Sequence, residues 1–182
     1  PPPPPPPTHF FFHEHAGLRD PLWSRGLVDV YKRQVYLGWE LLDEELQKKV
    51  PGGIVGQEHP DGIYGDYIRE IDQQGDVIWE WYAAKELDMA QFPLDPTVHR
   101  KEYAHANTIF PCENGDYIIN WRFNNTMLRI DRETREVVWH LTEPTYGQHH
   151  DVQELNNKNI LFFANGTDAV SYTHLRAHET RE

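Results

Sequence analysis

Five polar side chains in three short segments of the sequence could do chemistry. Histidine offers a nitrogen that can act as a nucleophile or exchange a proton near neutral pH. Arginine offers a permanent cation with forked donors, and asparagine offers a further donor. The candidates are His105 and Asn107 in "EYAHANTIF", Arg122 in "NWRF", and His149 and His150 in "GQHHD". Together they could hold an anionic substrate or contribute to a metal site.

The spacing of these residues predicts which of them can share a site. In an extended chain, a separation of two places His105 and Asn107 on the same face. Adjacent residues such as His149 and His150 face opposite ways in a strand, so one of them at most should face a shared site. Each candidate also has a structural alternative. His105 could be a hydrogen-bonded structural histidine, and Arg122 could stack on an aromatic ring or pair with an acid.

Two other kinds of site are disfavoured by the sequence. His105, one of the paired histidines and an acid would suit zinc or iron, but the ligand spacings typical of such sites are missing. No phosphate-binding loop or dinucleotide fingerprint occurs, and serine is nearly absent between residues 35 and 169, which disfavours a Ser-His-Asp hydrolase. We therefore expect no metal and no cofactor.

The composition narrows the function further. The chain has 182 residues and a net charge of −12, which argues against non-specific binding of nucleic acid and requires local donors for any anionic substrate. The single cysteine, Cys112, excludes an internal disulfide. No apolar run is long enough to cross a membrane. The composition thus disfavours nucleic-acid and membrane partners and leaves the oligomeric state open.

Repeating β-hairpins must position these side chains. "GDYIREIDQQGDVIWEW", Gly65–Trp81, predicts two strands joined by a turn at residues 73–76, and "NTMLRIDRETREVVWHL", Asn125–Leu141, repeats the pattern about 60 residues later. Asp72, Asp131 and Asp151 have the character of turn or strand-end caps.

A second type of unit alternates with these hairpins. Asn-rich turns lead into strands in Glu113–Trp121 and Asn156–Gly166. Repeated β-units that end in a tryptophan strand are typical of propeller blades. We predict an all-β partial β-propeller of about three blades. One or two short helical insertions are expected. The first lies within Ala83–Met89, and the second within Trp39–Gly53, where an excursion between strands is the alternative.

The two ends differ from the middle. Residues 1–34 open with seven prolines and contain "DVYKRQ", and residues 170–182 contain "VSYTHLRAHET". Both motifs resemble translated sequencing adapters at the ends of metagenomic reading frames. We predict that both ends are non-native or disordered flanks, and that residues 35–169 form the propeller domain as a piece of a longer protein. The piece alone is expected to be inactive.

Four segments in order resemble the arylsulfate sulfotransferase family: "HPDGIYGDYIREIDQQGDVIWEW", "YAHANT", "NGDYIINWRFNNTMLRIDRETREVVWHL" and "QHHDVQELNNKNILFFANG". The resemblance implies a six-bladed propeller enzyme of the periplasm. It also implies transfer of a sulfuryl group from an aryl sulfate donor to a phenol acceptor through a sulfohistidine, without a nucleotide donor.

The resemblance also implies roles for individual residues. The family's His-x-Asn motif corresponds to His105 and Asn107, its next strand-end arginine to Arg122, and its catalytic histidine to His150. His149 stands where glutamine is usual, which makes it an alternative nucleophile, and Ala164 replaces a common acid. The competing hypothesis is a non-enzymatic β-propeller binding module. In an enzyme His105, Asn107, Arg122 and His150 must face one cavity.

Overall fold

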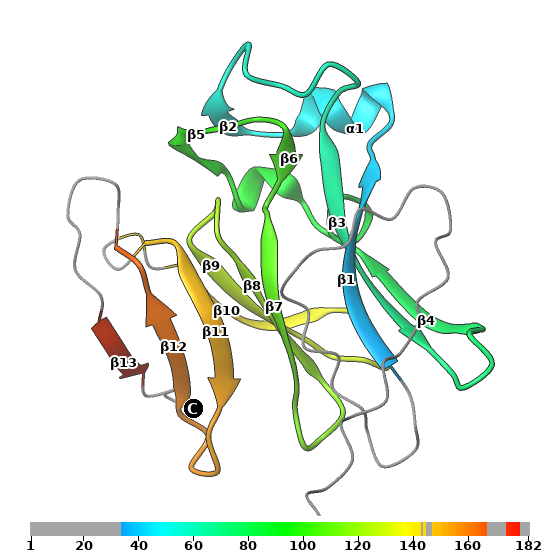
Figure 1. Cartoon of the computed structure of the whole chain (residues 1–182), viewed down its shortest axis with the longest axis vertical. Coiled ribbons are helices and arrows are strands. Elements are labelled where there is room, and N and C mark those ends of the chain that lie inside the picture. Colours follow the sequence, from blue (N-terminus) through cyan, green and yellow to red (C-terminus); the bar gives the residue numbers. More distant parts are fainter. Residues whose placement is uncertain (1–33, 143, 145–146, 167–173, 179–182) are drawn as a thin grey trace, which may run out of the picture.

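The computed structural model describes residues 34–142, 144, 147–166 and 174–178. Strands dominate this part of the chain, and Figure 1 shows three mainly antiparallel sheets following one another in chain order. The short helices and a small two-stranded sheet lie together at one end of the molecule, at the top of Figure 1. The prediction of an all-β partial β-propeller is confirmed.

The first sheet contains β1 (Gln34–Leu41), β3 (Tyr64–Ile71) and β4 (Val77–Tyr82) in the order β1-β3-β4. The short strand β6 (Glu102–Tyr103) pairs with β3 in parallel. The predicted hairpin is confirmed as β3 and β4. Its turn is closed by Asp72, whose side chain accepts hydrogen bonds from the backbone N–H groups of Gln74 and Asp76, both at 2.9 Å.

The second sheet is a four-stranded antiparallel meander in the order β10-β9-β8-β7. Its strands are β7 (Ala106–Pro111), β8 (Tyr117–Trp121), β9 (Thr126–Ile130) and β10 (Val137–Thr142). Every residue of β8 is buried, because this strand lies between neighbouring sheets. The predicted second hairpin is confirmed as β9 and β10, with Asp131 capping the turn.

The third sheet contains β11 (His149–Glu154), β12 (Ile160–Ala164) and β13 (His174–His178). The β13 backbone pairs antiparallel with β12, although its residues lie in the flank that the sequence predicts to be non-native or disordered. Residues 1–33 and 179–182 lie outside the described residues. The domain boundaries near residues 34 and 170 stay predictions.

The predicted helix within Trp39–Gly53 is correct only in its middle. Trp39 belongs to β1, and α1 covers Glu44–Lys49, where the Asp43 side chain caps it by accepting from the backbone N–H of Leu46 at 2.8 Å. This helix is also an excursion between strands, since it leads into β2 (Gly52–Ile54), which pairs in parallel with β5 (Leu94–His99). The other predicted insertion forms α2 (Ala83–Glu86) and the 3-10 helix η1 (Met89–Gln91).

Two buried clusters join the sheets in pairs. Between the first and second sheets, Trp81 and Trp121 are completely buried, with ring centroids 6.4 Å apart. Between the second and third sheets, Ile118 and Met127 pack in one cluster with Phe162. The sheets therefore pack as successive blades, and the loops between them carry the candidate site. Within the part of the chain that the structure describes, no helix is long and apolar enough to cross a membrane.

Candidate active site

The paired histidines open β11 and occupy different environments. His149 is completely buried, with its ring centroid 4.7 Å from that of Phe162. His150 is only half-buried, so the predicted alternation of the two side chains is confirmed. After His150 the strand bulges, and Asp151 takes a φ of 52°. Asp151 is therefore part of a β-bulge rather than the strand-end cap that the sequence suggests.

The ring of His150 is held through one nitrogen. Its Nδ1 lies 2.8 Å from the backbone oxygen of Gln148 and 2.8 Å from Asn165 Nδ2. The Gln148 carbonyl only accepts and favours the tautomer with a proton on Nδ1, in competition with the Asn165 amide nitrogen, which donates. The tautomer that Gln148 favours has its lone pair on Nε2. Burial lowers the pKa of His150, and the positive charges of Arg122 and His105 lower it further. The hydrogen bond to the Gln148 backbone acts in the opposite direction and raises the pKa. This imidazole is therefore neutral at neutral pH.

Arg122 lies just beyond the end of β8 and contacts the segment that leads into β11. Its Nη2 and Nε donate to Gln148 Oε1, at 2.8 and 3.3 Å. Its backbone N–H donates to the carbonyl oxygen of His105 at 3.2 Å. Gln148 therefore holds Arg122 through its side chain and His150 through its main chain. No separate sequence signal indicates this role of Gln148, although the residue precedes both histidines.

His105 does not lie in an extended segment. Ala104 and His105 have φ values of 80° and 56°, and β7 begins only at Ala106. The basis for placing His105 and Asn107 on one face is therefore wrong. The His105 ring instead stacks on Phe123, with centroids 4.5 Å apart and planes at 21°, and its Nδ1 lies 2.7 Å from Glu102 Oε1.

Asn107 braces the main chain of β11 from the second sheet. Its Nδ2 donates to the backbone oxygen of His149 at 2.7 Å. The completely buried Asn120 donates to the same oxygen at 2.6 Å and to Asn107 Oδ1 at 2.7 Å. Sequence reasoning missed Asn120, although a polar residue in the middle of the apolar run "DYIINW" was an available signal.

The structure thus brings three of the five predicted residues together. Arg122 is bonded to His105 through the main chain and to Gln148, which in turn contacts His150. Asn107 lies behind them against β11, and His149 is packed into the core. The group combines a neutral imidazole, a permanent cation and a second imidazole beside a carboxylate. Such a set can accept an anionic group and move a proton.

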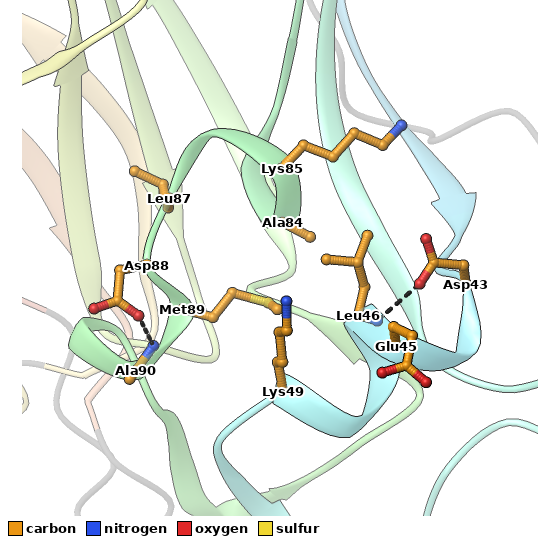
Figure 2. Close-up of a pocket in the computed structure, with 10 residues that line it drawn as sticks. All are labelled: Asp43, Glu45, Leu46, Lys49, Ala84, Lys85, Leu87, Asp88, Met89 and Ala90. Atoms are coloured by element: carbon orange, nitrogen blue, oxygen red, sulfur yellow. Dashed lines mark hydrogen bonds between the residues drawn. The ribbon is translucent and has the colours of Figure 1, made fainter.

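A separate groove lies away from these residues. Figure 2 shows it between α1 and the α2–η1 segment, with a volume of about 830 Å³, and none of the five predicted residues lines it. Two of its carboxylates, Asp43 and Asp88, cap helices. Among the described residues, no group of three or more His, Cys, Asp or Glu side chains could hold a metal ion.

Comparisons with known proteins identify the family. One similar solved structure is a selenomethionine-substituted virginiamycin B lyase from Staphylococcus aureus, with 16% identity and a TM-score of 0.38 over 81% of this chain and 46% of that chain. This chain thus spans about half of that protein's length. No curated protein matches the chain. The sequence model described as "Arylsulfotransferase (ASST)" matches residues 56–147, half of the chain, including His105, Asn107 and Arg122. The chain belongs to the arylsulfotransferase (ASST) family.

Proposed function

We propose that the complete protein containing this chain transfers a sulfuryl group from an aryl sulfate to a phenol, with His150 as the nucleophile. The observation that carries this proposal is the state of the His150 ring. Its Nδ1 is engaged by the Gln148 carbonyl, and its pKa is lowered by burial and by the positive charges of Arg122 and His105. A neutral imidazole with its lone pair on Nε2 is a competent nucleophile.

The first half-reaction forms a bond between Nε2 of His150 and the sulfur atom. The bond from sulfur to the aryl oxygen breaks, and the phenolate that leaves takes a proton from His105. In the second half-reaction the acceptor phenol returns a proton to His105 while its oxygen attacks sulfur. The bond between nitrogen and sulfur then breaks, and Nε2 regains its lone pair. Each half-reaction resembles in-line phosphoryl transfer, with charge spread over three oxygens.

Arg122 supplies the local positive charge that a protein of net charge −12 needs to bind a sulfate ester. Its guanidinium now points two donors at the neutral Gln148 Oε1. A sulfonate has the stronger acceptors and can take both donors in the forked geometry. Asn107 is already bonded to the His149 carbonyl, so we assign it the positioning of β11 rather than contact with the sulfuryl group.

The test uses the purified complete protein with 4-nitrophenyl sulfate, with and without phenol, and follows nitrophenolate release. We expect release that depends on phenol and that falls on the order of a thousandfold or more in His150→Ala. The matched control is His149→Gln, which places glutamine where the family resemblance has it and should remain active.

Two outcomes would contradict the proposal. If the folded protein releases no nitrophenolate, a binding propeller without enzymatic activity becomes the better account of the site. If activity is lost in His149→Gln but retained in His150→Ala, the nucleophile lies one residue earlier than proposed.

A further inference from the structure

Glu102 is the closest acidic partner of the proposed acid, His105. Glu102 lies in β6 and His105 lies just before β7, and Glu102 Oε1 is 2.7 Å from His105 Nδ1. Only 13% of the Glu102 side chain and 25% of the His105 side chain are exposed. The contact does not have the geometry of a hydrogen bond, but a partly buried carboxylate 2.7 Å away favours a proton on Nδ1 electrostatically.

Asp66 holds the backbone of the same segment. It lies in β3 and is almost completely buried, and its Oδ2 accepts a hydrogen bond from the backbone N–H of Ala106 at 2.7 Å. Burial raises the pKa of Asp66 well above its usual range, and the nearby negative charge of Glu102 raises it further. The two acids therefore act differently. Asp66 anchors the residue after His105, and Glu102 approaches the ring itself.

Contacts on the ring faces fix the remaining freedom of His105. The ring stacks on Phe123 and lies 6.1 Å from the ring of Trp39, centroid to centroid. Nδ1 lies beside the Glu102 carboxylate without a well-aligned hydrogen bond, and Nε2 is the nitrogen left for exchange with a substrate. The pairing is similar to that in which an acid orients a catalytic histidine without touching the reacting atoms.

We propose that Glu102 is a positioning residue that keeps the Nδ1 proton on His105 and so reserves Nε2 for proton exchange with the phenol oxygen. This inference rests on the proposed function, because the proton that Nε2 exchanges belongs to the sulfuryl transfer. Asp66 supports it by holding the backbone next to the ring.

The kinetic test compares a donor with a good leaving group, 4-nitrophenyl sulfate, with a poor one, 4-methylphenyl sulfate, in the complete protein. A poor leaving group depends more on protonation in the transition state. We expect Glu102→Gln to lower kcat/KM for 4-methylphenyl sulfate about tenfold more than for 4-nitrophenyl sulfate. The control is Glu86→Gln, which removes an acid paired with Arg135 away from the site, and it should change neither value.

A spectroscopic test does not depend on turnover. In protein labelled with ¹⁵N-histidine, at a pH where imidazoles are neutral, the His105 nitrogen shifts report which nitrogen carries the proton, and His105→Gln assigns the signals. We expect the Nδ1–H form to dominate in the wild type and to lose its dominance in Glu102→Gln, because an amide can donate as well as accept.

The two tests separate the inference from the function on which it rests. An altered tautomer in Glu102→Gln, in a protein that transfers no sulfuryl group, would leave the positioning role standing and remove the proposed function. Equal losses for both donors together with an unchanged tautomer, in an active enzyme, would overturn the role of Glu102 and leave the proposed function intact.

Discussion

A buried ion pair between the first and second sheets yields the most quantitative prediction. Glu70 of β3 is 1% exposed, and Arg132, in the turn between β9 and β10, donates to its Oε2 from Nε at 2.8 Å and from Nη2 at 2.7 Å. The Tyr117 hydroxyl contacts the same oxygen at 3.2 Å. Removing Arg132 would leave the charge of Glu70 buried with weaker compensation.

We expect Arg132→Met to lower the free energy of unfolding by about 3 kcal/mol, the low end for breaking a buried ion pair, because Tyr117 stays in contact. With a urea dependence of about 2 kcal/mol per molar, the unfolding midpoint would fall by about 1.5 M. The matched control is Arg135→Met in the same turn. Arg135 pairs with Glu86 of α2, but the side chains are 42% and 28% exposed, so the cost should stay below about 1 kcal/mol.

The assay is urea unfolding of the chain followed by tryptophan fluorescence. Trp79 and Trp81 donate to the backbone oxygens of Arg132 and Arg135, at 2.9 and 3.1 Å, so they report on this interface while both substitutions leave those oxygens in place. The double variant Glu70→Gln/Arg132→Met should recover at least half of the loss, because the buried carboxylate charge is removed together with its arginine. A loss in Arg132→Met no larger than that in Arg135→Met would refute the reasoning.

Three further predictions concern buried or partly buried polar groups. The pKa of Asp66 is raised in the folded state, so the stability of the wild type falls as pH rises above the pKa of the unfolded chain. The stability of Asp66→Asn relative to the wild type should therefore rise between pH 4 and pH 7, by about 1.4 kcal/mol for each pH unit between the unfolded and the folded pKa. A difference in urea midpoint between variant and wild type that is equal at the two pH values would contradict this. Burial raises the pKa of the Cys112 thiol to about 12, so iodoacetamide should label it only in urea, and rapid native labelling would refute this. Asn107→Ala should cost about 1–2 kcal/mol in urea unfolding, because it removes a donor to the His149 carbonyl; an unchanged midpoint would show that Asn120 alone suffices.

The hairpins were predictable because their signals are local. The alternation in β3 and β4 and the turn with Asp72 lie within a few residues of one another, and the same holds for β9, β10 and Asp131. The start of α1 was harder to predict. The apolar spacing from Leu41 to Val50 fits a helix, but pairing of Leu41 with Tyr64 holds that end of the segment in β1. Tertiary pairing overrode the local pattern there.

The site was only partly predictable because its contacts join distant segments. Residue type and order indicated His105, Arg122 and His150, yet the groups that hold them come from elsewhere in the chain. Gln148 reaches back 26 residues to Arg122, and the bond from Asn120 to the His149 carbonyl spans 29. No local pattern encodes such pairs. The left-handed backbone at Ala104 was also unpredictable, because alanine rarely adopts it, whereas histidine is among the residues enriched in that region.

The distribution of unusual backbone conformations gives an independent argument for the location of the functional site. Of the seven non-glycine residues with positive φ in the described part of the chain, five belong to the site segments, and these are Ala104, His105, Asn125, Gln148 and Asp151. They are mutually supported, since Asn125 Oδ1 accepts from the Gln148 N–H at 2.8 Å and Gln148 binds Arg122. A backbone conformation of this kind costs of order 1–3 kcal/mol and persists only where surrounding contacts impose it. At an ordinary turn such as that of β3 and β4, glycine at position 75 avoids the cost. The chain instead retains these side chains around His150 and Arg122, which supports a functional role for this group of loops.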